Sequence, residues 1–562
     1  MSRFFYIPIL VTLLSCSSSS DLSKTQVISK QVEFVSISAP YDENGWTEEE
    51  AIDYLIDKFT YGYTDSLYNE MKAKGVDTWL TGQFNPTPVP QFNKRLIERY
   101  PVLALDVKEI GETYPGLVVT LYSIGLNSRM GGEKANLRGN INFNEMFGTT
   151  LRNVQAVSRK WFYEMEGGEA LREPMKDLGI GNFMELMYQL QAQKLYRAVY
   201  SPNQVEEKMT DFWFNHFNVS ITRINDVATN VLSYERDAIR PYVFGQFNDM
   251  LKATATHPAM LTYLDNTNSE APEDAKTLVP YEPRQFRIEQ NNVRSINENY
   301  ARELLELHTL GVDGGYTQKD VEEVARILTG WKTSPLIYPA PPFIKKRIEN
   351  KIVSDGRSVA KDGFYFNAGA HDAGSKTVLG KEYPADRGVE EGYDLLEQLS
   401  NHPSTARFIS SKIATYFVND NPSKTLVDRM ASRFWESDGN IKQLMKTMVE
   451  SPEFWDKANI KSKAKSPFEF VVNTLRSSNA RLKDEAEVLL WCNRMGQPLF
   501  SYQPPTGYPT EATFWLNEAA IVQRIKFSYL LDKNQISGVM IPINNKRIKI
   551  AEAFVSPAFQ KR

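Results

Sequence analysis

The amino-acid sequence predicts a mainly α-helical protein: a large multi-helix domain with short loops and room for one small β-hairpin. Apolar residues recur at spacings of three and four along most of the chain, as on the buried side of a helix. Helix start and stop residues flank many of these runs. Hydrophobic residues make up 42% and charged residues 24% of the 562 positions, which is typical of globular proteins. We expect residues 46–562 to form a single extended helical domain, with residues 295–331 as its core motif.

Residues 1–16 predict a signal peptide that is removed from the mature protein. Arg3 precedes the apolar stretch Phe4–Leu14, and the segment ends in Leu-Leu-Ser-Cys at Cys16. This ending resembles the lipobox of bacterial lipoproteins, in which the cysteine is acylated; an ordinary signal with an incidental cysteine is the alternative. Residues 17–45 are expected to be a polar tether. We therefore expect an exported, lipid-anchored protein of the bacterial cell envelope, at the outer membrane or cell surface rather than the cytoplasmic membrane.

Charge and cysteine content argue against a nucleic-acid-binding protein and a disulfide-stabilised protein. The net charge of −4 predicts no polyanion-binding surface, so nucleic acid is not an expected partner. Cys16 and Cys492 are the only cysteines, which excludes a disulfide framework. Cys492 follows an apolar run and is expected to be a buried small hydrophobe. No later stretch approaches the roughly 18 apolar residues of a membrane span. The membrane is therefore an expected partner only through the N-terminal anchor.

Helical patterns follow in order along the N-terminal half. One begins near Thr47, with Glu48–Glu50 in its first turn, where carboxylates suit the helix dipole. A second covers Asp65–Lys74 and stops at Gly75. The pattern weakens between residues 100 and 150, where Gly116–Ile124 could be a strand or a buried helix. The next predicted helices are Leu186–Tyr200, Val205–Phe217, Tyr234–Tyr242, Asp249–Ala255 and Ala259–Asp265.

The segment Ser295–Trp331 predicts a helix, a glycine-rich turn and a second helix. Ser295 with Glu298, and Thr317 with Asp320, have the spacing of capping boxes. Further along, Ser334–Arg357 contains four prolines and a basic run, and we expect a loop. After this segment, the sequence predicts a hairpin of Phe364–Phe366 with Lys376–Leu379 and helices at Val389–Leu399 and Ser404–Val418.

All five histidines lie in stretches that are rich in sequence motifs: His216, His257, His308, His371 and His402. Histidine suits both metal ligation and acid–base chemistry. No standard metal-binding spacing is present. His308 falls on an apolar helix face, so a hydrogen-bonded core histidine is the competing interpretation. His257 and His402 precede prolines and could cap the helices that follow. For His216, among Phe and Trp residues, both interpretations stay open.

Two further groups carry candidate chemistry. His371 and Asp372, with Lys376 nearby, lie in a predicted glycine-bounded loop that could form the edge of a site. On the central helix Asn299, Arg302, Glu303 and Glu306 share one side. They could line a carboxylate-rich cleft or form a solvated ion-pair network that includes Glu298 with Arg302. The residues that we predict to be catalytic are Glu303, Glu306, His308, His371, Asp372 and His216. Those that we predict to bind substrate are Asn299, Arg302, His257, Asp265 and Lys376.

Several stretches together resemble a bacterial family catalogued as domain of unknown function 1800. The most specific is Asn297–Trp331. The others include Arg197–Asn218, His257–Asp265, His371–Gly380, Pro403–Phe417, Ser466–Arg476, the Gly507-Tyr508-Pro509 turn and the terminal Ser-Pro-Ala-Phe-Gln-Lys-Arg. The chain departs from the family at Tyr508, where Trp is more usual, and by an apparent insertion at Ser334–Arg357.

The resemblance implies an exported, largely helical protein of one extended domain with no established activity. It also implies a second exported, sulfatase-like protein as a possible partner, because the two families are often paired in genomes. Two hypotheses follow. The chain is an enzyme that acts on extracellular polysaccharide by acid–base or metal-assisted chemistry, with a divalent metal ion as the candidate cofactor. Alternatively, it is a non-catalytic envelope scaffold or binding partner of the sulfatase-like protein.

Overall fold

The computed structural model describes residues 34–115, 176, 179–223, 226–281, 294–337, 342–542 and 550–562. The predicted signal peptide with Cys16, residues 17–33 of the predicted tether and the segment Gly116–Ile124 lie outside the described residues. The described chain from Val35 onward belongs to one compact unit. None of its helices is both long enough and apolar enough to cross a membrane.

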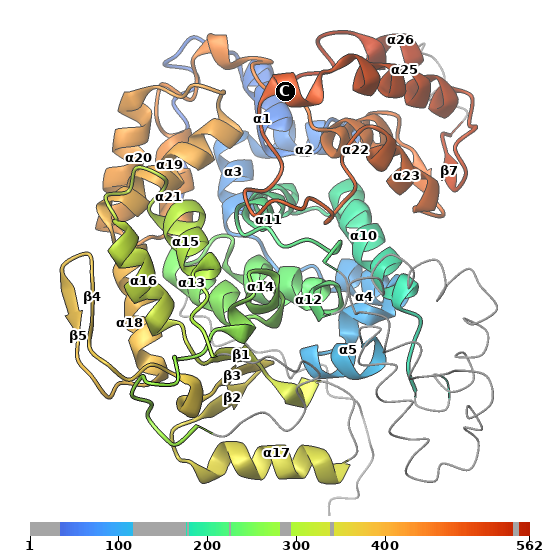
Figure 1. Cartoon of the computed structure of the whole chain (residues 1–562). Coiled ribbons are helices and arrows are strands. Elements are labelled where there is room, and N and C mark those ends of the chain that lie inside the picture. The colour runs from blue at the N-terminus through green and yellow to red at the C-terminus, as the bar shows by residue number, and fades with distance from the viewer. Residues whose placement is uncertain are drawn as a thin grey trace, which may run out of the picture. The chain divides into compact units, whose positions relative to one another are not determined.

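Helices dominate the structure, which confirms the predicted fold class (Figure 1). The helices of the N-terminal half are α1 (Glu48–Phe59), α2 (Asp65–Lys74), α3 (Val76–Phe84), α4 (Pro90–Arg99), α5 (Val107–Thr113), α10 (Phe183–Tyr200), α11 (Gln204–His216), α12 (Asp226–Ser233), α13 (Phe247–Thr256) and α14 (Pro258–Tyr263). Those of the C-terminal half are α15 (Asn299–Glu303), α16 (Gln318–Ile327), α17 (Pro342–Ser354), α18 (Val389–Ser400), α19 (Pro403–Phe417), α20 (Lys424–Glu436), α21 (Ile441–Val449), α22 (Pro467–Ser477), α23 (Ala486–Arg494), α24 (Ala512–Trp515), α25 (Glu518–Asp532) and α26 (Ile550–Val555). Two π-helical segments, η3 (Tyr234–Ile239) and η6 (Leu304–Thr309), continue α12 and α15.

The strands are short and antiparallel, and they correct the predicted hairpin. β3 (Phe364–Phe366) lies between β1 (Trp331–Thr333) and β2 (Val359–Lys361). β4 (Lys376–Val378) pairs instead with β5 (Lys381–Tyr383). The predicted pairing of Phe364–Phe366 with Lys376–Leu379 is therefore wrong, since each segment has a nearer or better-placed partner. The remaining strands, β6 (Arg481–Leu482) and β7 (Val539–Met540), form a two-stranded ribbon.

The predicted loop at Ser334–Arg357 contains a helix, α17, of 13 residues. Its prolines lie at or before the first turn, where the missing N–H of Pro342 costs no intrahelical hydrogen bond. The basic run that suggested a solvated loop lies on this helix, and Lys345 forms an ion pair with Glu112 on α5. The prolines therefore mark the start of a helix rather than its absence.

The helical body begins before residue 46. Within the segment expected as a tether, Val35, Ile37 and Ala39 are buried and extended. Their backbone N–H groups donate to side chains spaced four apart on α3, namely Asn85, Thr81 and Asp77, at 3.1, 3.0 and 2.9 Å. Between them, Ser36 and Ser38 bond to Lys446 and Glu450 at the end of α21. These eleven or so residues, 35–45, are thus part of the packed structure.

The two predicted capping boxes have opposite outcomes. Thr317 and Asp320 form the predicted box at the start of α16. Ser295 and Glu298 do not, because α15 begins one residue after Glu298 and its first turn is capped from Asn297, whose Oδ1 accepts from the Asn299 N–H at 2.9 Å. An Asx turn has replaced the expected box.

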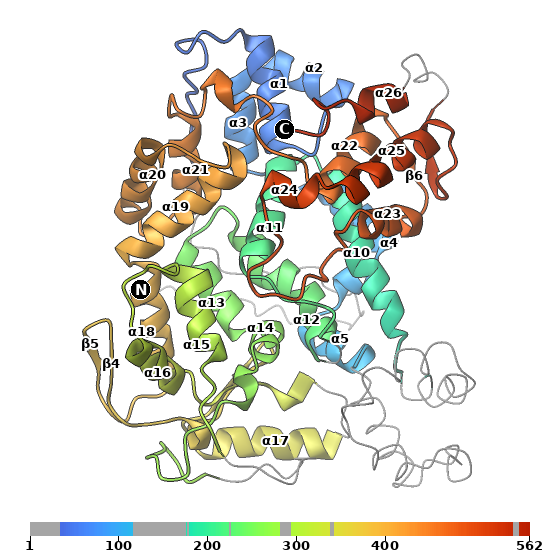
Figure 2. The same cartoon turned by 45° about the horizontal axis from the view of Figure 1, so that its top comes forward.

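Helix α11 lies in the middle of the described helices (Figures 1 and 2). It packs against α1, α3, α10 and η3, and its Trp213 is fully buried. The chain that follows α23 crosses beside α11, with Asn215 donating to the Tyr508 backbone oxygen at 2.9 Å (Figure 2). The end of the chain, Arg562, pairs through its backbone with Lys463 and lies beside α1 and α22. Segments that are far apart in the sequence therefore meet around α11.

Packing around Trp331 provides a test of the core. A Cβ at Gly392 of α18 would lie 2.2 Å from the ring of Trp331, which is completely buried. We expect Gly392→Ala to lower the free energy of unfolding by about 1–3 kcal/mol, since the ring has nowhere to move. Gly82→Ala on α3 is the matched control, because nothing lies within 4 Å of its Cβ, and it should raise stability by about 0.5–1 kcal/mol. Chemical denaturation that gave both variants the same sign would contradict this packing.

Candidate functional site

His216 and His308 lie together in the core. Their ring centroids are 6.3 Å apart, and His216 Nε2 donates to the His308 backbone oxygen at 3.1 Å. Both side chains are buried, with 2% and 1% exposure. Burial, assisted by the nearby Lys412, lowers the pKa of His308 to about 3 and that of His216 well below its usual value. Both rings are therefore neutral at neutral pH, as core histidines are.

His371, Asp372 and Lys376 do not form an exposed loop edge, because all three are buried. Asp372 pairs with Arg326 at 2.9 Å, and Lys376 pairs with Glu391 at 2.6 Å. His371 donates from Nδ1 to a backbone oxygen at 2.9 Å, and burial lowers its pKa to about 4. Burial raises the pKa of Glu391 to about 7, although Lys376 opposes that shift. The group is a closed ion-pair cluster that fastens the loop to α16 and α18.

The polar side of the central helix remains partly exposed. Arg302 forms the expected ion pair with Glu298 at 3.2 Å. Asn299 donates from Nδ2 to a backbone oxygen just after α14, at 3.3 Å. Burial, and then the neighbouring Glu306, raise the pKa of the Glu303 carboxyl. Of the predicted acid–base residues, Glu303 and Glu306 are the ones that solvent can still reach.

The remaining predicted residues have local structural partners. His257 and His402 cap α14 and α19, each accepting at Nδ1 from the backbone N–H two residues on, at 3.2 Å. Both capping interpretations are thereby confirmed. Asp265 pairs with Arg223 at 3.0 Å on the surface. The predicted site residues thus fall into separate groups, and the described residues contain no cluster of three or more His, Cys, Asp or Glu side chains able to hold a metal ion.

The buried histidines predict acid sensitivity. In the unfolded chain His308 has a pKa near 6.5, whereas in the fold its pKa is about 3. Between these pH values His308 is protonated in the unfolded state but neutral in the folded state. The free energy of unfolding therefore falls as the pH falls. Lowering the pH from 6.5 to 5 should cost about 2 kcal/mol for this residue alone. His308→Leu should reduce the pH slope of the unfolding free energy measured by denaturant titration.

The control for that experiment is His402→Asn, which keeps a capping side chain at a position that is partly exposed. Burial also lowers the pKa of the partly buried His402, so this variant should reduce the slope, but less than His308→Leu does. Equal slopes in wild type and His308→Leu would show that folding does not shift the pKa of His308.

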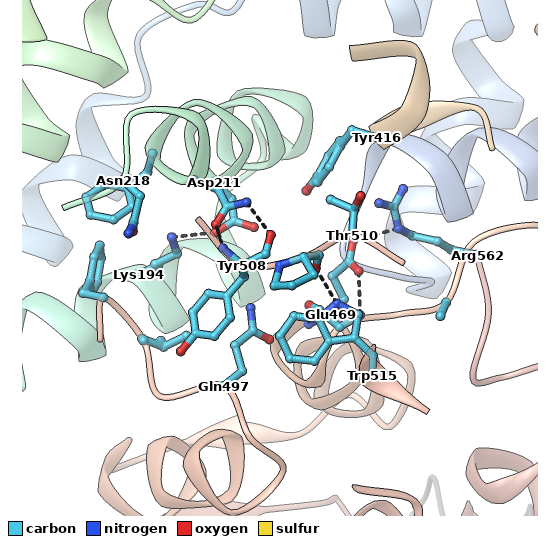
Figure 3. A pocket seen from close by; sticks show the side chains of 17 residues that line it. Lys194, Asp211, Asn218, Tyr416, Glu469, Gln497, Tyr508, Thr510, Trp515 and Arg562 are labelled. Carbon is cyan, nitrogen blue, oxygen red and sulfur yellow. Dashed lines mark hydrogen bonds and ion pairs between the residues drawn. The ribbon is translucent and has the colours of Figure 1, made fainter. Parts of the chain in front are cut away.

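A small cavity of about 60 Å³ lies beside α11 (Figure 3). It is formed by α10, α11, α19 and α22, by the chain between α23 and α24, and by the end of the chain. The residues that line it are Lys194, Asp211, Phe214, Asn215, Asn218, Tyr416, Ala464, Ser466, Glu469, Gln497, Leu499, Phe500, Tyr508, Pro509, Thr510, Trp515 and Arg562. We call this cavity the α11 pocket.

One side of the α11 pocket is an ion pair between Lys194 and Asp211, 2.6 Å apart (Figure 3). The Lys194 ammonium also lies over the rings of Phe500 and Phe214, at 4.8 and 5.4 Å from their centroids. Such faces attract a cation that has been taken out of water. The lysine is held firmly, and its charge is already matched by Asp211.

The opposite side centres on Glu469. Its Oε1 lies 2.5 Å from Lys208 Nζ and 2.8 Å from Arg562 Nε. Ser466 forms a capping box with the same carboxylate at the start of α22. The two cations and the hydrogen bonds hold the pKa of Glu469 far below its usual value despite burial, while burial, and then Arg562, lower that of Lys208 to about 8. Glu469 is therefore an anion at neutral pH and unsuited to donate a proton.

The third side is aromatic. The rings of Tyr508 and Trp515 lie 5.5 Å apart, and both are labelled beside Gln497 in Figure 3. The Tyr508 hydroxyl donates to the Pro498 backbone oxygen at 2.8 Å. Tyr508 occupies the position at which the family more often has Trp, so this difference from the family lies inside the pocket.

A buried network behind the pocket positions Lys194. Glu235 lies 3.8 Å from Lys194 and 3.6 Å from Arg240. Arg240 also pairs with Glu207 at 2.9 Å, and Glu207 lies 3.8 Å from Arg197. Alternating charges of this kind offset the cost of burying each one, and they leave few ways for the lysine to move.

None of the α11 pocket residues was among the predicted site residues. One signal could have found part of it: Asp211, Asn215 and Asn218 follow helical spacing through the aromatic run of α11, and such polar positions need partners. The meeting of Tyr416, Glu469 and Arg562 carries no comparable signal, because it depends on tertiary contacts. However, most stretches that suggested the family resemblance outside Asn297–Trp331 contribute to this pocket.

The fold and the pocket together define a mainly helical protein with a cavity lined by charge-paired, polar and aromatic side chains. The model of one protein family, described as a protein of unknown function (DUF1800), matches residues 54–560. The chain belongs to this family, as the resemblance predicted. No curated protein and no solved structure shows significant similarity to it.

Proposed function

We propose that the chain is an exported, lipid-anchored protein of the bacterial cell envelope that binds an extracellular polysaccharide at the α11 pocket. The observation that carries this proposal is the composition of the pocket wall. Aromatic rings from Tyr508 and Trp515 line the same cavity as the amide of Gln497 and the carboxylate of Asp211. A sugar presents apolar C–H groups on its ring faces and hydroxyls around its edge, so it matches a wall that combines rings with polar groups.

The size of the cavity limits which part of a polysaccharide can enter it. A volume of about 60 Å³ holds about four to six waters at roughly 10–15 Å³ each. That space suits a substituent that projects from a sugar ring, not a whole ring. The partly exposed Tyr508, Pro509 and Thr510 belong to the lining, and we place the ring itself against them. The exported location and the lipid anchor rest on the predicted signal peptide.

Asp211→Asn tests the binding function. The change preserves shape but removes the charge that matches Lys194 and accepts hydrogen bonds from sugar hydroxyls. We expect at least a roughly tenfold loss of affinity for polysaccharide isolated from the envelope of the source bacterium, measured by calorimetry. Asp428→Asn is the control, because Asp428 pairs with Lys424 on the surface of α20, and its affinity should equal that of wild type.

The alternative is a non-catalytic scaffold for the sulfatase-like exported partner. It predicts no polysaccharide binding and an unchanged partner interaction when Glu303 or His371 is replaced by Ala. Polysaccharide that binds wild type and Asp211→Asn equally would also reject the pocket as the binding site.

Acid–base catalysis on the bound polysaccharide is a second candidate, supported by Glu303. Its pKa is raised by burial and by Glu306, as suits a proton donor at neutral pH. Glu303 lies within electrostatic range of Tyr263, which is close to Asn218 of the α11 pocket. The Tyr263 hydroxyl also donates to the Gln503 backbone oxygen, in the chain that carries Tyr508. The carboxylate and the pocket are thereby linked through one side chain.

Glu303→Gln tests this candidate. It should reduce hydrolysis of bound polysaccharide at least a hundredfold, the usual contribution of a positioned acid, and leave affinity unchanged. Glu298→Gln, at the N-cap of the same helix and already paired with Arg302, is the control. Reducing-end release that is equal in the two variants would rule out Glu303 as the acid, and no release by wild type would leave binding alone.

A further inference from the structure

Two polar groups of the α11 pocket have no partner in the protein. Tyr416 Oη and Arg562 Nη1 are buried and form no hydrogen bond. Their side chains are only 9% and 3% exposed. The guanidinium lies 4.8 Å from the centroid of the Tyr416 ring, and both side chains line the cavity (Figure 3). Buried donors without acceptors are costly, so the two groups indicate where a ligand atom belongs.

Several buried cations lie around this point. Glu469 is the one carboxylate among the described residues that contacts Lys208 or Arg562. Two more buried cations lie nearby, Arg524 and Lys465, and each bonds to neutral acceptors, with no ion pair to a described carboxylate. Burial lowers the pKa of Lys465 to about 7, so this lysine would gain positive charge beside an added anion. An added negative charge would be stabilised here.

Across the pocket the balance is different. The carboxylate of Asp211 is paired with Lys194 at 2.6 Å, although after burial Asp211 and Glu469 also raise the pKa of the Tyr416 hydroxyl. The unpartnered N–H and O–H donors lie on the Arg562 side, so the ligand's negative group belongs beside Arg562 and Tyr416, and its uncharged hydroxyls belong beside Asp211.

We infer that the α11 pocket binds an oxyanion, held between Arg562 Nη1 and Tyr416 Oη. The oxyanion is a carboxylate, sulfate or phosphate group, and the inference that a sugar carries it rests on the proposed function. Arg562 supplies a charged donor and Tyr416 a neutral one, and a group of this size fits the cavity of about 60 Å³. The site would thus select acidic polysaccharides over neutral ones.

The test titrates sodium acetate, sodium sulfate and sodium phosphate separately into the full chain at pH 7, followed by calorimetry. We expect one-to-one binding of at least one oxyanion, and the arm that responds identifies the group. Tyr416→Phe should weaken that binding roughly tenfold or more. It should not disturb the fold, because the hydroxyl has no partner in the protein. Tyr63→Phe, which alters a partly exposed tyrosine paired with Asp65, is the control and should bind as wild type does.

A second comparison separates this inference from the proposed function. D-glucuronate should bind more tightly than D-glucose, and the difference should shrink in Tyr416→Phe. No binding of any of the three oxyanions, or equal affinity in wild type and Tyr416→Phe, overturns the inference even if a neutral polysaccharide still binds. Tyr416-dependent oxyanion binding without binding of any polysaccharide supports the inference and rejects the proposed function.

Discussion

The carboxylate of Glu469 joins parts of the chain that are far apart in the sequence. It forms ion pairs with Lys208 of α11 and with Arg562 at the end of the chain. It also forms the capping box with Ser466 at the start of α22. Removing one partner from a buried ion pair typically costs about 3–5 kcal/mol, because the remaining charge stays buried. Here one carboxylate is paired with two cations, so its loss would leave both of them without this partner. The arrangement of α11, α22 and the terminal segment, and hence the shape of the pocket, depends on this one group.

Helix α11 separates two environments. Toward the core it presents Trp213 and His216, which pack among aromatic rings in a neutral setting. Toward the pocket it presents Asp211 and Asn215, which meet charged and polar partners. The first side supplies burial free energy, and the second would be expensive to bury without its partners. A rigid helix of this kind can hold polar groups in place because its other side is fixed in the core.

Local signals predicted local structure well. The span of α2 was predicted exactly as it occurs, and the caps by Thr317, His257 and His402 were also predicted, since each depends on neighbours within a few residues. Pairing between strands was not, because Phe364–Phe366 had no sequence signal for β1. Prolines misled the prediction for α17, where composition suggested a loop but the position of Pro342 permits a helix.

The candidate site was predicted poorly for a related reason. His308, His371 and Asp372 attracted attention as residue types that perform chemistry, yet each is occupied in holding the fold. The α11 pocket draws its charged groups from Lys194 to Arg562. A sequence shows which residues could be functional, whereas contacts across hundreds of residues decide which of them keep an unpartnered atom. The unpartnered atoms of Tyr416 and Arg562 became visible only in the folded chain.

The way the chain enters its body has a mechanical consequence. Residues 35–39 run extended between α3 and α21, and successive residues bond alternately to the two helices. If the N-terminus is held at a membrane, as proposed, tension on it pulls along this segment. The hydrogen bonds to Asn85, Thr81 and Asp77 would then have to break before the tension reached α1.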